Sequence, residues 1–119
     1  MDSQKYTIVE SNANGPYHSL SPFEDIDAEK FFCMLFIMQI CRDRDDIVNE
    51  YCQLNKDIII LQKDKDTFYD ILCLNDLISA FIEFCANTKG ITVEDKSATI
   101  STDGNFYRID IVKCDDPTS

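Results

Sequence analysis

The apolar run FFCMLFIMQIC, residues 31–41, constrains the fold of this chain more than any other segment. Its single polar residue is Gln39, and at 100° per residue the large side chains point to all sides of a helix. A membrane span takes about 20 apolar residues, and charged residues follow this shorter run at once. The run therefore predicts a helix that is buried on both sides in a folded domain, without membrane insertion.

A sheet covers only one side of such a helix, so the other side needs a second cover. The helix expected over residues 47–54 is short, and the N-terminal segment is poor in apolar residues. An uncovered apolar surface would promote aggregation. We therefore expect a protein partner, either a second copy of the chain or a different protein. The predicted interface comprises Phe31, Phe32, Met34, Leu35 and Met38 of the helix, with Ile59 and Leu61 of the apolar segment IIIL that follows it.

The residues on either side of the run predict where helices begin and end. In the segment SPFE, Ser21 is placed to cap the helix, Pro22 suits its first position and Glu24 completes a capping box. The charged segment RDRDD, residues 42–46, interrupts the apolar pattern, and residues 47–54 return to helical spacing. Two helices and one long bent helix both fit this pattern.

Residues 58–72 allow two assignments. Three successive isoleucines begin this segment, and β-branched residues favour a strand. A β-hairpin across the charged stretch that follows would bring Ile60 close to Tyr69, and we expect this hairpin. In the rival assignment, a helix begins at Thr67 and continues through Cys85.

The C-terminal third predicts a helix followed by strands. Asn75 can cap the helix and Gly90 can end it. The segment ITVE, residues 91–94, reads as a strand, and Asp103-Gly104 is typical of a two-residue hairpin turn. The alternation of apolar and polar residues on either side of this turn gives the same register as the turn itself. The resulting pairs are Ile100 with Tyr107 and Ala98 with Ile109.

Taken together, these elements predict an α+β fold with N-terminal helices, a β-hairpin, a further helix and a three-stranded antiparallel meander. This α-β-β-α-β-β-β order is similar to that of the roadblock and profilin-like domains, small modules that often dimerise as scaffolds; the similarity is one of element order alone. A mostly α-helical fold with a C-terminal β-hairpin is the alternative. We expect a flexible tail over residues 1–20, a single α+β domain over 21–113 and a second tail over 114–119.

The composition restricts the partners. Acidic residues outnumber basic ones by 22 to 11, which gives a net charge of −11. Such a surface repels phosphate, so we expect neither nucleic-acid binding nor docking on anionic membranes. The polar N terminus carries no recognisable signal sequence, which favours an intracellular protein. The six cysteines lack zinc-site spacing, and we expect buried, reduced thiols, with Cys114 the most exposed.

The sequence predicts no catalytic, cofactor-binding or metal-ligating residues. The one histidine, His18, lies in the loop-like N-terminal segment, and three glycines leave no phosphate-binding loop. The acidic pairs Asp43/Asp45 and Asp64/Asp66 lack the glycine of a calcium loop, and basic residues interleave them.

We therefore expect a non-enzymatic interaction or scaffold subunit that forms a homodimer or hetero-oligomer through its apolar helix surface. In the alternative, the same Phe and Met side chains line an apolar groove that binds a peptide or a lipid-like ligand. The isoleucine-rich composition is compatible with a viral or parasite protein that acts on its host. A third hypothesis is a thiol enzyme that uses Cys114 or a helix cysteine, which requires a thiol with a lowered pKa.

Overall fold

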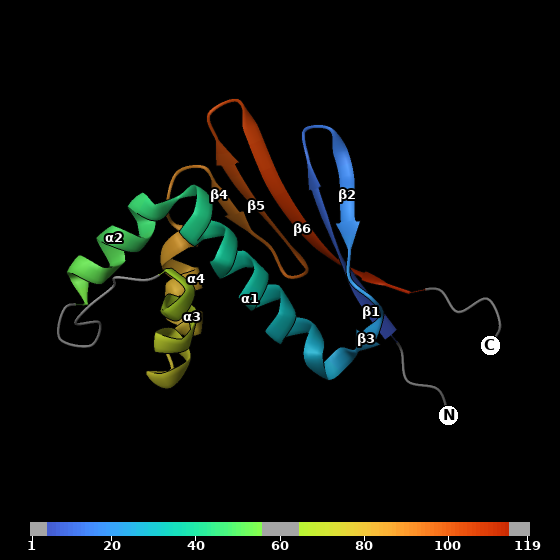
Figure 1. The fold of residues 1–119 in the computed structure, drawn as a ribbon, viewed down its shortest axis with the longest axis horizontal. Coiled ribbons are helices and arrows are strands. Elements are labelled where there is room, and N and C mark those ends of the chain that lie inside the picture. The colour runs from blue at the N-terminus through green and yellow to red at the C-terminus, as the bar shows by residue number, and fades with distance from the viewer. Residues whose placement is uncertain (1–4, 56–64, 115–119) are drawn as a thin grey trace.

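The structure is a computed structural model that describes residues 5–55 and 65–114. In chain order its elements are β1 (Lys5–Asn12), β2 (Gly15–Ser19), β3 (Phe23–Glu24), α1 (Asp25–Asp43), α2 (Asp45–Leu54), α3 (Lys65–Leu74), α4 (Ile78–Ala86), β4 (Ile91–Val93), β5 (Ser97–Thr102) and β6 (Asn105–Lys113). The fold is α+β, with the strands in one antiparallel sheet of order β2-β1-β6-β5-β4 and the short β3 beside β1 (Figure 1). Helices α1 and α4 contact the sheet, whereas α2 and α3 pack on those two helices.

The N-terminal segment forms a β-hairpin, so the expected tail over residues 1–20 is wrong over residues 5–19. Strand β1 lies between β2 and β6, and Ile8 pairs with Ile111 in the core. The loop-forming residues of this segment make the hairpin turn, in which Gly15 takes a φ of 105°. A strand with few apolar residues suffices here because only its core-facing side chains, such as Ile8, need to be apolar.

The predicted capping box is also wrong. Residues 23–24 pair as β3 with the start of β1, and α1 begins at Asp25. Glu24 precedes the helix in an extended conformation, without a side-chain capping hydrogen bond. Strand pairing prevails at this point because it also places Phe23 against Phe31, with ring centroids 5.0 Å apart.

The helical conformation is interrupted at one residue between α1 and α2. The two-helix alternative is therefore correct, and the single bent helix is wrong. Arg44 has φ −134° and ψ 56°, outside the helical region. Its backbone N–H still donates to the carbonyl of Ile40, at 2.8 Å, and the next helix starts at once.

The expected hairpin over residues 58–72 is wrong where the structure describes it, because Tyr69 and Ile71 lie in α3. Residues 58–64 lie outside the described part of the chain. The rival assignment was correct in placing a helix here, but it expected one continuous helix. Asp76, with a φ of 55°, separates α3 from α4. Asn75 donates its side-chain amide to the carbonyl of Ile71 at 2.9 Å, so it ends α3 and does not cap α4.

The C-terminal meander is confirmed in type and register. Strands β4, β5 and β6 are consecutive neighbours, and Thr102 pairs with Asn105 across the Asp103-Gly104 turn. The predicted pairs Ile100 with Tyr107 and Ala98 with Ile109 are both present. The complete order, three strands, four helices and three strands in the described residues, differs from the α-β-β-α-β-β-β order that suggested the roadblock and profilin-like analogy.

Helices of the same chain cover much of the apolar run. Helix α1 contacts the sheet and also α2, α3 and α4. At 100° per residue its buried positions spread over roughly 220° of the helix circumference. They are Ala28, Phe32, Phe36, Ile37, Ile40 and Cys41. The remaining arc holds Phe31, Met34, Leu35 and Met38, which we call the outer stripe.

Candidate binding groove

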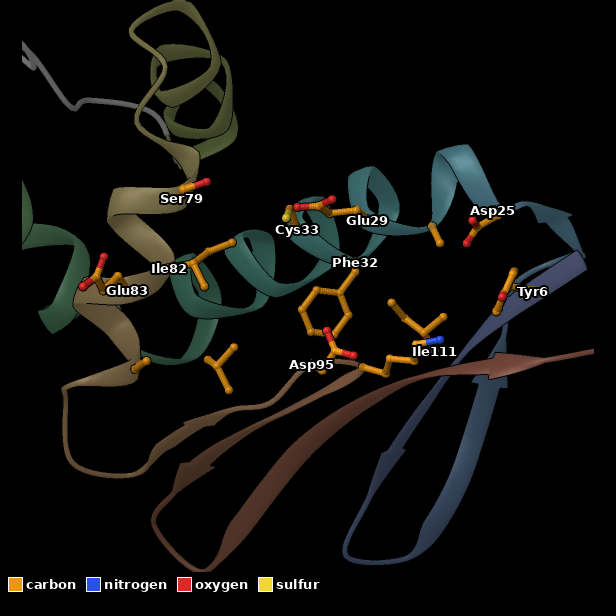
Figure 2. A pocket seen from close by; sticks show the side chains of 14 residues that line it. Tyr6, Asp25, Glu29, Phe32, Cys33, Ser79, Ile82, Glu83, Asp95 and Ile111 are labelled. Carbon is orange, nitrogen blue, oxygen red and sulfur yellow. The ribbon is translucent and has the colours of Figure 1, made fainter. Parts of the chain in front are cut away.

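A groove of about 600 Å³ opens between the N-terminal half of α1, helix α4 and the helix-covered face of the sheet (Figure 2). Helical spacing explains which residues reach it, because positions three and four apart share one face. The α1 residues are Asp25, Ala28, Glu29, Phe32 and Cys33, and the α4 residues are Ser79, Ile82, Glu83 and Ala86. The sheet and the β4–β5 turn contribute Tyr6, Val93, Asp95, Lys96 and Ile111.

The floor of the groove is apolar. In Figure 2 the ring of Phe32 extends from α1 toward the sheet, and Ile82 extends from α4 into the same space. Ile82, Val93 and Ile111 pack against the core yet remain partly exposed. Partly exposed aliphatic side chains around a cavity offer a surface that a ligand can remove from water.

The rim of the groove is acidic. Asp25, Glu29, Glu83 and Asp95 are exposed and come from α1, α4 and the β4–β5 turn. We call these four carboxylates the acidic rim. In the described part of the chain, none of them lies within 4.0 Å of a cationic side chain. Lys96 is the one basic residue among those that line the groove, and its ammonium lies 5.4 Å from the centre of the Tyr6 ring.

The thiol in the groove does not favour nucleophilic chemistry. Burial, together with the nearby Glu29 and Cys73, raises the pKa of Cys33 to about 11. Burial likewise raises the pKa of Cys85 to about 12. Both thiols are therefore protonated at neutral pH, and a protonated thiol is a poor nucleophile. Cys73 is the exposed cysteine and Cys114 is half-buried, so the expectation that Cys114 is the most exposed thiol is wrong.

The predicted interface residues divide into three groups. Phe32 is only 6% exposed, belongs to the core and forms part of the groove floor. Phe31, Met34 and Leu35 are half-buried, and Met38 is 50% exposed, so these four residues form the outer stripe away from the groove. The other two predicted residues, Ile59 and Leu61, lie outside the described residues.

A polar cluster at the other end of the sheet was missed from the sequence. The Glu10 carboxylate accepts a hydrogen bond from the Tyr107 hydroxyl, and its second oxygen lies 2.6 Å from His18 Nδ1. Burial, followed by the bond to Glu10, raises the pKa of Tyr107 well above its usual range. The cluster joins β1, β2 and β6. Only recognition of the N-terminal hairpin could have shown that His18 lies opposite Glu10.

Two further properties concern metals and membranes. Within residues 5–55 and 65–114, no three His, Cys, Asp or Glu side chains are grouped so that they could hold a metal ion. No helix in these ranges is both long and apolar enough to cross a membrane.

No protein-family model matches this chain, and no curated protein or solved structure matches it either. The groove and the outer stripe are therefore the features from which a function can be argued.

Proposed function

We propose that this chain is a non-catalytic protein-binding module whose groove accepts a segment of a partner protein. The observation that carries the proposal is the apolar floor of Phe32, Ile82 and Ile111 in a cavity of about 600 Å³. Ligand sites commonly have volumes of about 300–1,000 Å³ and combine apolar walls with a few polar groups. A cavity of this size receives several side chains of a bound peptide.

A peptide suits the groove better than a lipid-like ligand. Fatty acids and anionic phospholipids carry negatively charged head groups, and the acidic rim would repel them. A peptide can supply apolar side chains to the floor and polar or basic groups to the rim. An intracellular location belongs to the same proposal, since the free cysteines are stable in a reducing compartment.

Selection from a random-peptide display library on the wild-type chain tests the proposal. Ala86 and Ala80 are both exposed residues of α4, but only Ala86 lines the groove. Ala86→Trp fills the groove, and Ala80→Trp is the matched control. We expect the enriched peptides to bind the wild type and the Ala80→Trp variant but not the Ala86→Trp variant. Enriched peptides that bind both variants equally, or a library that yields no binder, would reject the groove as the binding site.

Self-association through the outer stripe is a second candidate function. Met38 is half exposed, and Phe31, Met34 and Leu35 continue the apolar surface at helical spacing. The partner in this case is a second copy of the chain. Sedimentation velocity over a concentration series tests the idea. Met38→Lys should abolish a dimer, whereas Ile26→Lys, on an 87% exposed residue of α1 outside the stripe, should leave it intact. A wild-type chain that stays monomeric throughout rejects self-association.

A further inference from the structure

The acidic rim restricts the chemistry of the partner segment. Its four carboxylates line the same groove as the apolar floor and come from three separate parts of the fold, α1, α4 and the β4–β5 turn. Against them stands the single ammonium of Lys96, so the charged lining carries a net charge of 1 − 4 = −3. The whole chain has a net charge of −11, which adds to the negative potential at the groove.

We infer that the groove binds a basic amphipathic segment of a partner protein, in which Lys or Arg residues flank apolar side chains. This inference rests on the proposed function and names the chemical class of its ligand. The apolar side chains of the segment lie on Phe32, Ile82 and Ile111, and its cations pair with the acidic rim. Charge complementarity selects the partner, because a neutral segment contacts the apolar floor without pairing with the acidic rim, and an acidic segment is repelled by the rim.

The position of the charges makes them useful for recognition. Exposed carboxylates at the edge of an apolar surface keep their hydration until a cation arrives, so they add little penalty to the free groove. Opposite charges across an interface mainly increase the association rate and select the partner. The floor then supplies the larger part of the affinity by burial of apolar area. Binding should accordingly weaken as the salt concentration rises.

A pair of charge variants tests the inference. The first changes the rim to amides: Asp25→Asn, Glu29→Gln, Glu83→Gln and Asp95→Asn. The control changes four exposed carboxylates outside the groove: Glu50→Gln, Asp70→Asn, Asp76→Asn and Asp103→Asn. Both variants have a formal net charge of −11 + 4 = −7, so a difference between them reports position and not total charge. Circular dichroism establishes that both are folded.

The probe is the set of peptides that the random library enriches on the wild-type chain. We expect these peptides to combine apolar residues with two or more Lys or Arg. By fluorescence anisotropy the rim variant should bind them about tenfold more weakly than the wild type, which corresponds to about 1.4 kcal/mol shared among exposed ion pairs. The control variant should stay within about twofold.

The outcomes separate this inference from the proposed function. One outcome is a set of enriched peptides that have no basic residues and do not bind the Ala86→Trp variant. This outcome supports the binding function and contradicts the inference. Equal weakening in the rim and control variants means that net charge alone attracts the peptides, and this also overturns it. If the peptides bind the Ala86→Trp variant as well as the wild type, the groove is not the binding site. A rim variant that does not fold is replaced by Glu29→Gln/Glu83→Gln, with Glu50→Gln/Asp70→Asn as its control.

Discussion

Arg44 forms a two-point hydrogen-bonded ion pair with Asp46: Nε donates to Oδ1 and Nη2 donates to Oδ2, each at 3.1 Å. The remaining donor, Nη1, reaches the carbonyl of Lys89 at 3.2 Å and that of Ser101 at 3.5 Å. One guanidinium thus joins the residues between α1 and α2 to strand β5 and to the turn before β4. The single ammonium group of a lysine cannot reproduce this planar set of donors.

Replacement of Arg44 by lysine should therefore destabilise the fold although the charge is kept. We expect Arg44→Lys to lower the free energy of unfolding by about 1–2 kcal/mol, since several hydrogen bonds to carbonyl and carboxylate groups are lost. Urea denaturation measures this change. Arg42→Lys, at an exposed position near the same helix end, serves as the control and should stay within about 0.5 kcal/mol of the wild type. Equal stability of the two variants would show that the Arg44 contacts contribute nothing.

Gly90 lies against the same guanidinium and supports a second prediction. Its φ is 91°, and a Cβ there would lie 3.1 Å from Arg44 Nη1 and 3.4 Å from the Ser101 carbonyl oxygen. Gly104 also has a positive φ, of 75°, but a Cβ there meets nothing within 4 Å. Both alanine variants carry backbone strain of about 1 kcal/mol, and Gly90→Ala adds the steric conflict. Thermal denaturation should rank wild type above Gly104→Ala and Gly104→Ala above Gly90→Ala; the reverse order of the two variants would contradict the argument.

Alkaline pH should reveal the Tyr107 bond to Glu10. Because burial raises the folded-state pKa of this phenol, the neutral form is favoured on folding. Its contribution is fully present below the unfolded pKa of about 10 and is lost as the pH rises above that value. Tyr107→Phe should reduce the loss of stability above pH 10. At pH 7 it should lower the free energy of unfolding by about 1 kcal/mol, because Glu10 loses a donor.

Urea titrations at pH 7 and at alkaline pH measure both effects. Tyr17→Phe is the matched control, on a phenol that is 54% exposed. It should leave the stability at pH 7 nearly unchanged. A Tyr107→Phe chain with the wild-type pH dependence would show that this hydroxyl ionises as freely in the folded state as in the unfolded state.

The sequence predicted the C-terminal meander and missed the N-terminal hairpin and its pairing with the end of the chain. The β5–β6 register was predictable because the Asp103-Gly104 turn and the adjacent alternation act within a few residues. Strand β1 has two partners: β6 lies at the other end of the chain, and no local pattern records that pairing. Its local partner, β2, was missed because the loop-forming residues between them suggested a tail. Helix α3 was taken for a strand because the isoleucines before it in the sequence have high β propensity. Phe68 and Leu72 are buried in the core at helical spacing, whereas the isoleucines lie outside the described residues.

The candidate site was less predictable than the fold. Phe32 was named as an interface residue because the run has no polar face, yet its burial and its place on the groove floor depend on where α4 lies. The carboxylates Glu29, Glu83 and Asp95 are dispersed along the sequence and line one groove only in the folded chain. The outer stripe was recovered in part, since Phe31, Met34, Leu35 and Met38 follow directly from helical periodicity.

Two positions of α1, two residues apart, provide a last prediction about where its buried surface ends. Ile37 is 0% exposed, whereas Leu35 is half-buried on the outer stripe, although both lie in the same apolar run. Ile37→Asp should leave the chain unfolded, because an unpaired buried charge costs several kcal/mol against a total stability of about 5–15 kcal/mol. In Leu35→Asp the carboxylate can reach water, so this variant should stay folded with a loss of about 1–3 kcal/mol. Circular dichroism and size-exclusion chromatography distinguish the two. If both variants unfold, the outer stripe is core and offers no surface to a second copy; if both stay folded, Ile37 does not lie in the core.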